Sequence, residues 1–224
     1  MSAREDQARL RAGRVTGSVA QRIMDAVHRT TWNTIARDLR NPKPFYSVED
    51  TPNMPAPLRW GQLHEIQAAA HFWERHPEYD VHSVPFLHWH DPMQRERHRW
   101  FGFSPDRMLS APGHDTTWIS GLEIKCPYDN AIHTEVIKSG QVPAWCIWQI
   151  YHGMYVSGLR RWWFVCFDPR PIEPEWRYFE REVIADDAML DRLARTLDEF
   201  LEPYSMGEDF KPRSMTAADF ARIF

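Results

Sequence analysis

The sequence places six apolar residues in succession, from Trp162 to Phe167, and ends this run with Asp168-Pro169. Aromatic and β-branched residues favour strands, and a proline after the run cannot continue a hydrogen-bonded ladder. The segment Arg161–Phe167 therefore predicts a buried strand. Such a strand needs neighbouring strands and a covering layer, which the rest of the chain must supply.

Four other segments have the composition of strands. They are Val81–Trp89, Trp100–Leu109, Trp118–Cys126 and Tyr178–Ile184. A charged turn at 91–99 and a turn around Gly113 would join the first three as a mostly antiparallel group. The fourth would pair with the buried strand.

Helical periodicity covers much of the remaining chain. Ser18 and Gln21 fit a capping box, with Ser18 as the N-cap and Val19, Ile23 and Val27 on one apolar face. Further helices are predicted at about 31–39, 58–76, 130–138, 143–156 and from the capping residue Asp186 onward.

Two of these helices have a predicted core stripe. The stripes are Leu63, Ile66, Ala70 and Trp73 in the helix at 58–76, and Leu190, Leu193, Leu197 and Leu201 in the last helix. Together the elements predict an α/β (α+β) domain with a central mixed sheet flanked by helices.

A chain of 224 residues fits a single domain over 1–224, with a proline-rich arm at about 42–57 and a C-terminal tail at about 204–224. There is no membrane-length apolar run and no signal-peptide core, so we expect a cytoplasmic protein without membrane contacts. Three dispersed cysteines exclude a four-cysteine iron–sulfur cluster. The net charge of −4 counts against a nucleic-acid partner, unless the acids are gathered to hold metal ions.

The segment GLEIKCP, residues 121–127, contains an acid and a lysine two residues apart. Side chains alternate between faces along a strand, so Glu123 and Lys125 project to the same side. Taken alone, they are better explained as an ion pair on a solvated strand face.

The preceding strand favours a functional site over a simple ion pair, because it ends in Ser104-Pro105-Asp106. The turn around Gly113 would bring Asp106 close to Glu123. Two facing carboxylates are unfavourable unless a cation lies between them. Mg²⁺ suits such a site because it prefers oxygen ligands and keeps several waters.

These two segments together resemble the signature of the PD-(D/E)xK nucleases. The longer strings GFSPDRML and GLEIKCP resemble the exonuclease of phage lambda and the YqaJ-like viral recombinases. The likeness continues at 10–18 (an LR.G...T.S box), 60–65 (a WG...E box), 149–154 and 164–170, in the order found in that family. It covers about residues 10–200.

The resemblance implies a PD-(D/E)xK, restriction-endonuclease-like fold and two-metal hydrolysis of phosphodiester bonds. Asp106, Glu123 and the backbone carbonyl of Ile124 would bind Mg²⁺, with two ions expected and Mn²⁺ able to substitute. Lys125 would position or deprotonate the attacking water and stabilise charge on the phosphate. Glu65 would be a further catalytic carboxylate, and its alternative role is that of an ion-paired core residue.

Four residues would contact DNA by the same resemblance. Arg11 and Ser18 would bind a 5′-phosphate, Leu58 would part the last base pairs, and Gln149 belongs to a QxQ block. The alternatives are a surface arginine, a plain helix cap and a core leucine. The sequence departs from the family at Tyr151, which replaces the second glutamine, and at 128–131, where the family has a basic residue.

The activity implied is that of a 5′→3′ exonuclease, which degrades one strand of double-stranded DNA from 5′-phosphorylated ends to 5′-mononucleotides. It would leave a 3′ single-stranded tail for recombination. The resemblance also implies a homotrimeric ring, a single-strand annealing protein as partner, and a phage or prophage origin in a bacterial cytoplasm. The alternatives are a restriction-type or RecB-like endonuclease and a non-catalytic DNA-end-binding module.

Overall fold

The computed structural model describes residues 10–41, 54–88, 100–114 and 117–205. Within these ranges a five-stranded sheet has the order β1-β4-β5-β6-β7. Its strands are β1 (Asp80–His82), β4 (Arg107–Ser110), β5 (Trp118–Lys125), β6 (Arg161–Phe167) and β7 (Tyr178–Ile184). β5 and β6 are parallel and the other neighbours are antiparallel, which confirms the predicted mixed sheet.

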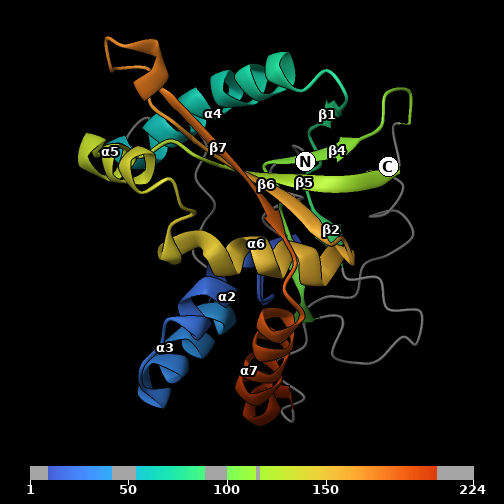
Figure 1. The fold of residues 1–224 in the computed structure, drawn as a ribbon. Helices are drawn as coiled ribbons and strands as arrows, with labels where there is room; N and C mark the ends of the chain where they lie inside the picture. Colours follow the sequence, from blue (N-terminus) through green and yellow to red (C-terminus); the bar gives the residue numbers. More distant parts are fainter. Residues whose placement is uncertain (1–9, 42–53, 89–99, 115–116, 206–224) are drawn as a thin grey trace.

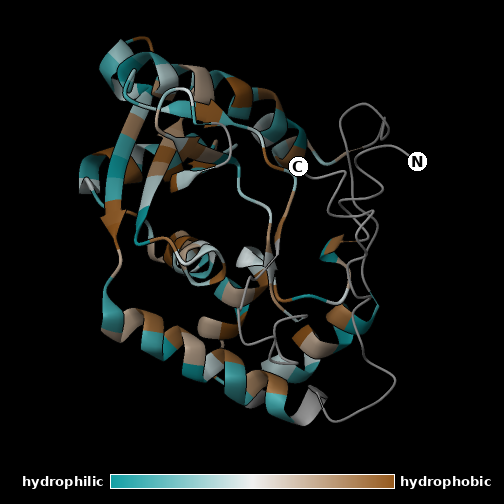
Figure 2. Ribbon diagram, turned by 90° about the vertical axis from the view of Figure 1, so that its right-hand side faces the viewer, coloured by the Kyte–Doolittle hydropathy of each residue, from teal (hydrophilic) through white to brown (hydrophobic). Residues whose placement is uncertain are grey.

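Helices cover both faces of this sheet (Figure 1). α4 (Ala56–Arg75) packs on β5 and β6 from one side, and α6 (Ala144–Ser157) packs on them from the other. The helices α2 (Gly17–Met24), α3 (Arg29–Arg40) and α7 (Asp187–Ser205) lie beyond α6, and α5 (Asn130–Ser139) contacts β6 and β7. Hydrophilic and hydrophobic stretches alternate along the helices, as expected where one face meets a core (Figure 2).

Alternation along β6 divides the core into two parts. Trp162, Phe164 and Cys166 belong to the cluster that includes α2, α6 and α7, whereas Val165 and Phe167 belong to the cluster under α4. Both faces of β6 are therefore covered, as predicted from its uninterrupted apolar run.

The ring of Trp162 lies where two glycines leave room for it. A Cβ atom on Gly121 in β5 would be 2.1 Å from this ring, and one on Gly153 in α6 would be 2.9 Å from it. Any larger residue at Gly121 would force the ring to move. The two glycines thus allow α6 to pack closely over the strand that carries Glu123 and Lys125.

The strand predicted at 81–89 is two short strands. They are β1, which pairs with β4 in the large sheet, and β2 (Leu87–His88), which forms a separate two-stranded sheet. The strand predicted at 100–109 is likewise broken, into β3 (Gly102–Phe103) and β4, and β2 pairs with β3. The prediction of two continuous strands was therefore wrong.

A single register nevertheless runs through both breaks, since Asp80 pairs with Ser110 and Leu87 pairs with Phe103. Pro85 lies in one gap and Pro105 in the other. A proline cannot donate a ladder hydrogen bond, so the two prolines explain why the long hairpin opens at this level.

Gln21 joins α2 to the main chain of α6. Its Nε2 donates to the carbonyl of Ala144 (3.0 Å), and its Oε1 accepts from the N–H of Trp148 (2.9 Å). An α-helix normally pairs these two groups with each other, so the amide of Gln21 is inserted into the first turn of α6. The predicted capping box was therefore wrong. The N-cap of α2 is Thr16, and its side chain makes no capping hydrogen bond.

The core stripe predicted for the helix at 58–76 was also wrong, because its members face outward. Exposed fractions are 50% for Leu63, 69% for Ile66 and 56% for Trp73, and Ala70 is exposed as well. The buried residues of α4 are Ala68, Ala69 and Phe72. Val27, placed on the apolar face of the first predicted helix, lies beyond the end of α2 and is 86% exposed.

The other predicted elements are confirmed. β6 and β7 have the predicted bounds, and α3, α5 and α6 end within two residues of theirs. α7 follows Asp186, whose carboxylate accepts from the N–H of Met189 (2.9 Å).

Residues 42–53 of the proline-rich arm and the tail after Ser205 lie outside the described residues, and a single domain over 1–224 stays a prediction. None of the described helices is long and apolar enough to cross a membrane.

Candidate active site

Asp106 directly precedes β4, where the long hairpin opens. The register of β4 on β5, with Arg107 opposite Leu122, would place Pro105 opposite Ile124. Pro105 lies outside β4, and the carboxylate of Asp106 instead accepts from the N–H of Ile124 at 2.6 Å. The break thus brings an acid to the edge of β5.

Glu123 and Lys125 project from β5 toward α6, as strand alternation predicts. The Nζ of Lys125 is 2.6 Å from Oε1 of Glu123, and it donates to Oε1 of Gln149 on α6 at 3.0 Å. Only 5% of the Glu123 side chain is exposed. This burial excludes an ion pair on a solvated strand face.

Glu65 approaches the same edge from α4, on the other face of the sheet. Its Oε1 is 2.6 Å from a terminal nitrogen of Arg107, which also donates to the backbone carbonyl of Asp106. The Glu65 side chain is 32% exposed. Glu65 is therefore ion-paired, but it lies at the rim of the site and not in the core.

The three acids create an excess of negative charge around Asp106. Burial, and after it the carboxylates of Glu123 and Glu65, raise the pKa of Asp106 well above its ordinary value. Burial alone would lower the pKa of Lys125, but Glu123 and Asp106 outweigh it and raise that pKa. Lys125 therefore remains an ammonium group among the carboxylates, suited to holding the oxygens of a phosphate.

The oxygen donors at this edge fit a hard divalent cation. Asp106 and Glu123 supply carboxylates, and the carbonyl of Ile124 leaves the strand on the same side as its N–H, which binds Asp106. The described residues contain no group of three or more His, Cys, Asp or Glu side chains that could hold a metal ion. A cation here would take two carboxylates, one carbonyl and several waters, which is the pattern for Mg²⁺ and unlike that for structural zinc.

Two of the predicted DNA-binding residues lie at this site. Gln149 binds Lys125, and Arg11 is close enough to Asp106 and Glu123 for both acids to affect its pKa. Burial lowers the pKa of Arg11, and the two acids oppose that effect.

The other two predicted DNA-binding residues are exposed near the starts of helices. Ser18 is the second residue of α2, and a Cβ atom on the neighbouring Gly17 would be 3.6 Å from the Cα of Gln149. The N-terminus of α2 therefore adjoins the partner of Lys125. Leu58, in the first turn of α4, is 43% exposed, which excludes a core leucine.

The prediction from sequence missed two arginines. Arg107 follows Asp106 directly, and a basic residue beside a candidate metal ligand was the available signal. Arg170, three residues after β6, binds Asp168 and stacks on Trp60 of α4, with its guanidinium carbon 4.4 Å from the ring centroid. The sequence neighbours of Arg107 and Arg170 do not show which distant residues these two arginines contact in the folded chain.

The departure from the family at Tyr151 has a structural explanation. Tyr151 is buried, and its hydroxyl accepts from the N–H of Asp186 at 3.2 Å. It therefore supports the start of α7.

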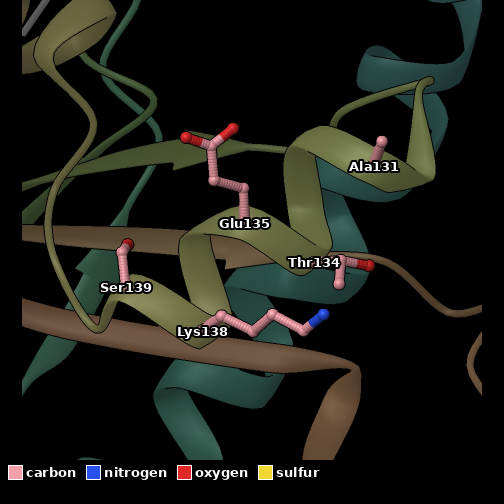
Figure 3. Close-up of a pocket in the computed structure, with 5 residues that line it drawn as sticks. All are labelled: Ala131, Thr134, Glu135, Lys138 and Ser139. Carbon is pink, nitrogen blue, oxygen red and sulfur yellow. The ribbon is translucent and has the colours of Figure 1, made fainter.

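A hollow elsewhere on the surface is lined by Ala131, Thr134, Glu135, Lys138 and Ser139 of α5 (Figure 3), none of which belongs to the candidate site.

Comparisons with known proteins agree with this fold. A family model for the YqaJ-like viral recombinase domain matches residues 7–160. The alkaline exonuclease LHK-Exo from Laribacter hongkongensis is similar at 25% sequence identity (TM-score 0.70), and its complex with dAMP at 23% (TM-score 0.71), each over 89% of this chain and 91% of the other. A phage-related exonuclease from Haemophilus somnus 129PT is similar at 10% identity (TM-score 0.55) over 85% of this chain and 93% of the other. A comparison with curated proteins finds no match. The likenesses confirm the predicted PD-(D/E)xK fold.

Proposed function

The chain belongs to the YqaJ-like viral recombinase family, and from that premise we propose that it is a Mg²⁺-dependent 5′→3′ exonuclease of double-stranded DNA. It digests one strand from a 5′-phosphorylated end to 5′-mononucleotides and leaves a 3′ single-stranded tail for recombination by strand annealing. The observation that carries this proposal is the meeting of Asp106, Glu123 and Lys125 at one edge of β5.

Asp106, Glu123 and the carbonyl of Ile124 hold Mg²⁺, with two ions expected and Mn²⁺ able to substitute. A metal ion held there would activate water for attack at neutral pH and would neutralise charge on the leaving oxygen. Glu123 and Gln149 fix the ammonium group of Lys125, which stabilises the charge that develops on the phosphate. Glu65 adds a carboxylate at the rim, where Arg107 orients it.

The DNA end binds beside this centre. Arg11 and the N-terminus of α2 at Ser18 hold the 5′-phosphate, because a guanidinium group and free helix N–H groups both bind phosphate oxygens. The exposed side chain of Leu58 separates the terminal base pairs and directs one strand to Asp106 and Glu123.

The active form is a homotrimeric ring in the bacterial cytoplasm, which acts on DNA ends together with a single-strand annealing protein. A ring that encloses DNA retains it without a strongly basic surface, which is compatible with a net charge of −4. Sedimentation equilibrium tests this assembly: a mass three times the 26.6 kDa of one chain is expected, and a monomer at micromolar concentration contradicts it.

The activity is tested on linear duplex DNA with a 5′-phosphate on one strand and a different label on each strand. With Mg²⁺, the phosphorylated strand alone is expected to be lost, while a covalently closed circle stays intact. Lys125→Ala is expected to lower the rate by at least about 100-fold, because it removes charge stabilisation at the phosphate. Lys138→Ala, which removes an exposed lysine of α5 outside the site, is the matched control and should retain the wild-type rate.

Each alternative has its own result in this assay. Cleavage of the closed circle indicates a restriction-type or RecB-like endonuclease. If folded protein binds DNA ends but releases no nucleotide with Mg²⁺ or Mn²⁺, a non-catalytic end-binding module is indicated. Loss of the strand without a 5′-phosphate contradicts the roles given to Arg11 and Ser18.

A further inference from the structure

The guanidinium group of Arg170 connects three segments of the chain next to the candidate active site. Its first partner is Asp168, a buried carboxylate one residue beyond β6. Nε of Arg170 donates to Oδ1 of Asp168 at 2.8 Å, and Nη2 donates to Oδ2 at 2.7 Å. Asn130 donates to the same carboxylate at 3.0 Å. This bidentate geometry fixes the plane of the guanidinium group.

The remaining donors of Arg170 reach the chain that follows Lys125. Nη1 donates to the carbonyl of Tyr128 at 2.9 Å, and Nη2 donates to the carbonyl of Pro127 at 3.3 Å. β5 ends at Lys125, so these two carbonyls belong to the second and third residues after the strand. Arg170 therefore holds the exit of the strand that carries Glu123, Ile124 and Lys125.

The guanidinium group also contacts α4. Its carbon lies over the ring of Trp60, 4.4 Å from the ring centroid, and Trp60 also meets the ring of Tyr128 edge-on, with ring centroids 6.0 Å apart. α4 carries Glu65 little more than one turn beyond Trp60. The side chain of Arg170 thus holds the segment after β5 against α4.

We propose that Arg170 is a positioning residue for the nuclease site, which fixes the end of β5 against α4 and thereby sets the places of Ile124, Lys125 and Glu65. The proposal rests on the nuclease activity proposed above. Burial raises the pKa of Asp168, but the hydrogen bonds from Arg170 and Asn130 together outweigh this effect and lower it, so Asp168 stays charged at neutral pH.

Lysine at position 170 tests this role because it keeps the charge and loses the bidentate and stacking geometry. Arg170→Lys is expected to lower kcat by about 10- to 100-fold while KM for DNA ends changes less than threefold, since small misplacement of reacting groups is costly. The rise in Tm that Mg²⁺ produces in wild type is expected to shrink as well, because the carbonyl of Ile124 is displaced.

Arg75→Lys is the matched control. Like Arg170, Arg75 combines an ion pair with an aromatic contact: it pairs with Glu180 at 3.0 Å and lies 5.3 Å from the ring centroid of Tyr178. It is the last residue of α4 and makes neither of these contacts with a site residue. This variant should keep the wild-type kcat and the full Mg²⁺-dependent rise in Tm. Asp168→Asn, which leaves Arg170 in place but weakens its anchor, should reproduce the Arg170→Lys effect in kcat and Mg²⁺ response.

The outcomes separate this proposal from the proposed function. An active wild type whose Arg170→Lys and Asp168→Asn variants, assayed well below their Tm, keep kcat within threefold overturns the positioning role. A change in KM alone also overturns it, because it would make Arg170 a DNA contact. An inactive wild type refutes the nuclease assignment, and the Mg²⁺-dependent rise in Tm then still reports whether Arg170 positions the metal ligands.

Discussion

At Asp106 the stability of the fold favours an uncharged side chain, whereas the chemistry of the site needs a charged carboxylate. Burial, together with the charges of Glu123 and Glu65, raises the pKa of the Asp106 carboxyl group. An uncharged residue would be more stable there, but it would bind a cation less well. Such a conflict is expected where a residue is retained for function.

Asp106→Asn should therefore stabilise the metal-free protein while it abolishes nuclease activity. The amide oxygen can still accept from the N–H of Ile124, and the repulsion with Glu123 and Glu65 is gone. A gain of about 1 kcal/mol, or about 2–4 °C in Tm, is expected. The raised pKa gives the sign of the pH dependence: the charged form costs stability as the pH rises through that pKa, so the gain is larger at pH 8 than at pH 5.

Thermal unfolding in EDTA at both pH values measures this effect. Asp106→Ala serves as the comparison, because it removes the repulsion and also the acceptor for Ile124, and it should gain less than Asp106→Asn. A Tm for Asp106→Asn below that of wild type at pH 8 would mean that the carboxylate stabilises the metal-free site.

Some site residues follow from the sequence because they depend on local geometry. Strand alternation predicts the common face of Glu123 and Lys125, and the turn around Gly113 brings Asp106 to β5. The bonds from Arg107 to Glu65 and from Lys125 to Gln149 join segments 42 and 24 residues apart. Which helix faces which side of the sheet decides these contacts, and no local pattern in the sequence specifies it.

For helices and strands too, local patterns are predictable from the sequence and tertiary packing is not. β6 and β7 were predicted with the correct bounds because apolar and β-branched runs between turn residues identify strands well. In α4 the sequence contains two candidate faces, and the face that packs on the sheet consists of Ala68, Ala69 and Phe72. Small residues allow close packing of helix on sheet, whereas a search for large apolar residues selects the opposite face.

The side-chain amide of Gln21 joins α2 to α6 through both its nitrogen, which donates a hydrogen bond, and its oxygen, which accepts one. Gln21→Leu removes the partners of the Ala144 carbonyl and the Trp148 N–H, and a loss of about 2 kcal/mol is expected. Gln21→Glu should lose more stability than Gln21→Leu at pH 8. Its carboxylate can accept from Trp148 but faces the carbonyl of Ala144 and the carboxylate of Asp25, which Gln21 now binds at 2.9 Å.

Urea unfolding of the two variants at pH 8 checks this order. Arg22→Ala is a suitable control, since Arg22 lies next in α2 but makes an exposed ion pair with Asp38, which is worth little. If Gln21→Glu is as stable as wild type, the donated bond to Ala144 contributes nothing. The prediction for the helix–helix contact is then wrong.

At the scale of the whole molecule, the sequence predicted a mixed sheet between helices but not how the hairpin ahead of β5 is divided between two sheets. The small sheet is tied to the N-terminal segment, because the N–H of Val15 donates to the carbonyl of Trp100 (2.8 Å) and the N–H of Gly102 donates to the carbonyl of Val15 (3.2 Å). These bonds connect residues more than 80 positions apart, so only the folded chain reveals them.

His152 of α6 lies where these parts meet. Its Nε2 donates to the carbonyl of Gly102 at 3.1 Å, and its ring lies near those of Phe101 and Phe103. Burial lowers the pKa of His152 to about 4, although the bond to Gly102 acts in the opposite direction. The ring is therefore neutral in the folded protein at pH 5, where a histidine in the unfolded chain is mostly charged.

This difference should make the whole fold sensitive to mild acid. A histidine with a lowered pKa contributes its stability fully above the unfolded value of about 6.5 and loses it as the pH falls toward 4. Between pH 7.5 and 5.0, His152 should reduce the free energy of unfolding by about 2 kcal/mol. Urea unfolding in metal-free buffer at these two pH values measures the loss. It should be smaller by that amount in His152→Gln, whose amide can still donate to Gly102, and unchanged in His71→Gln, which alters an exposed histidine of α4. An equal loss in wild type and His152→Gln would show that protonation of His152 is not what destabilises the fold, and other buried groups would then have to account for the sensitivity to acid.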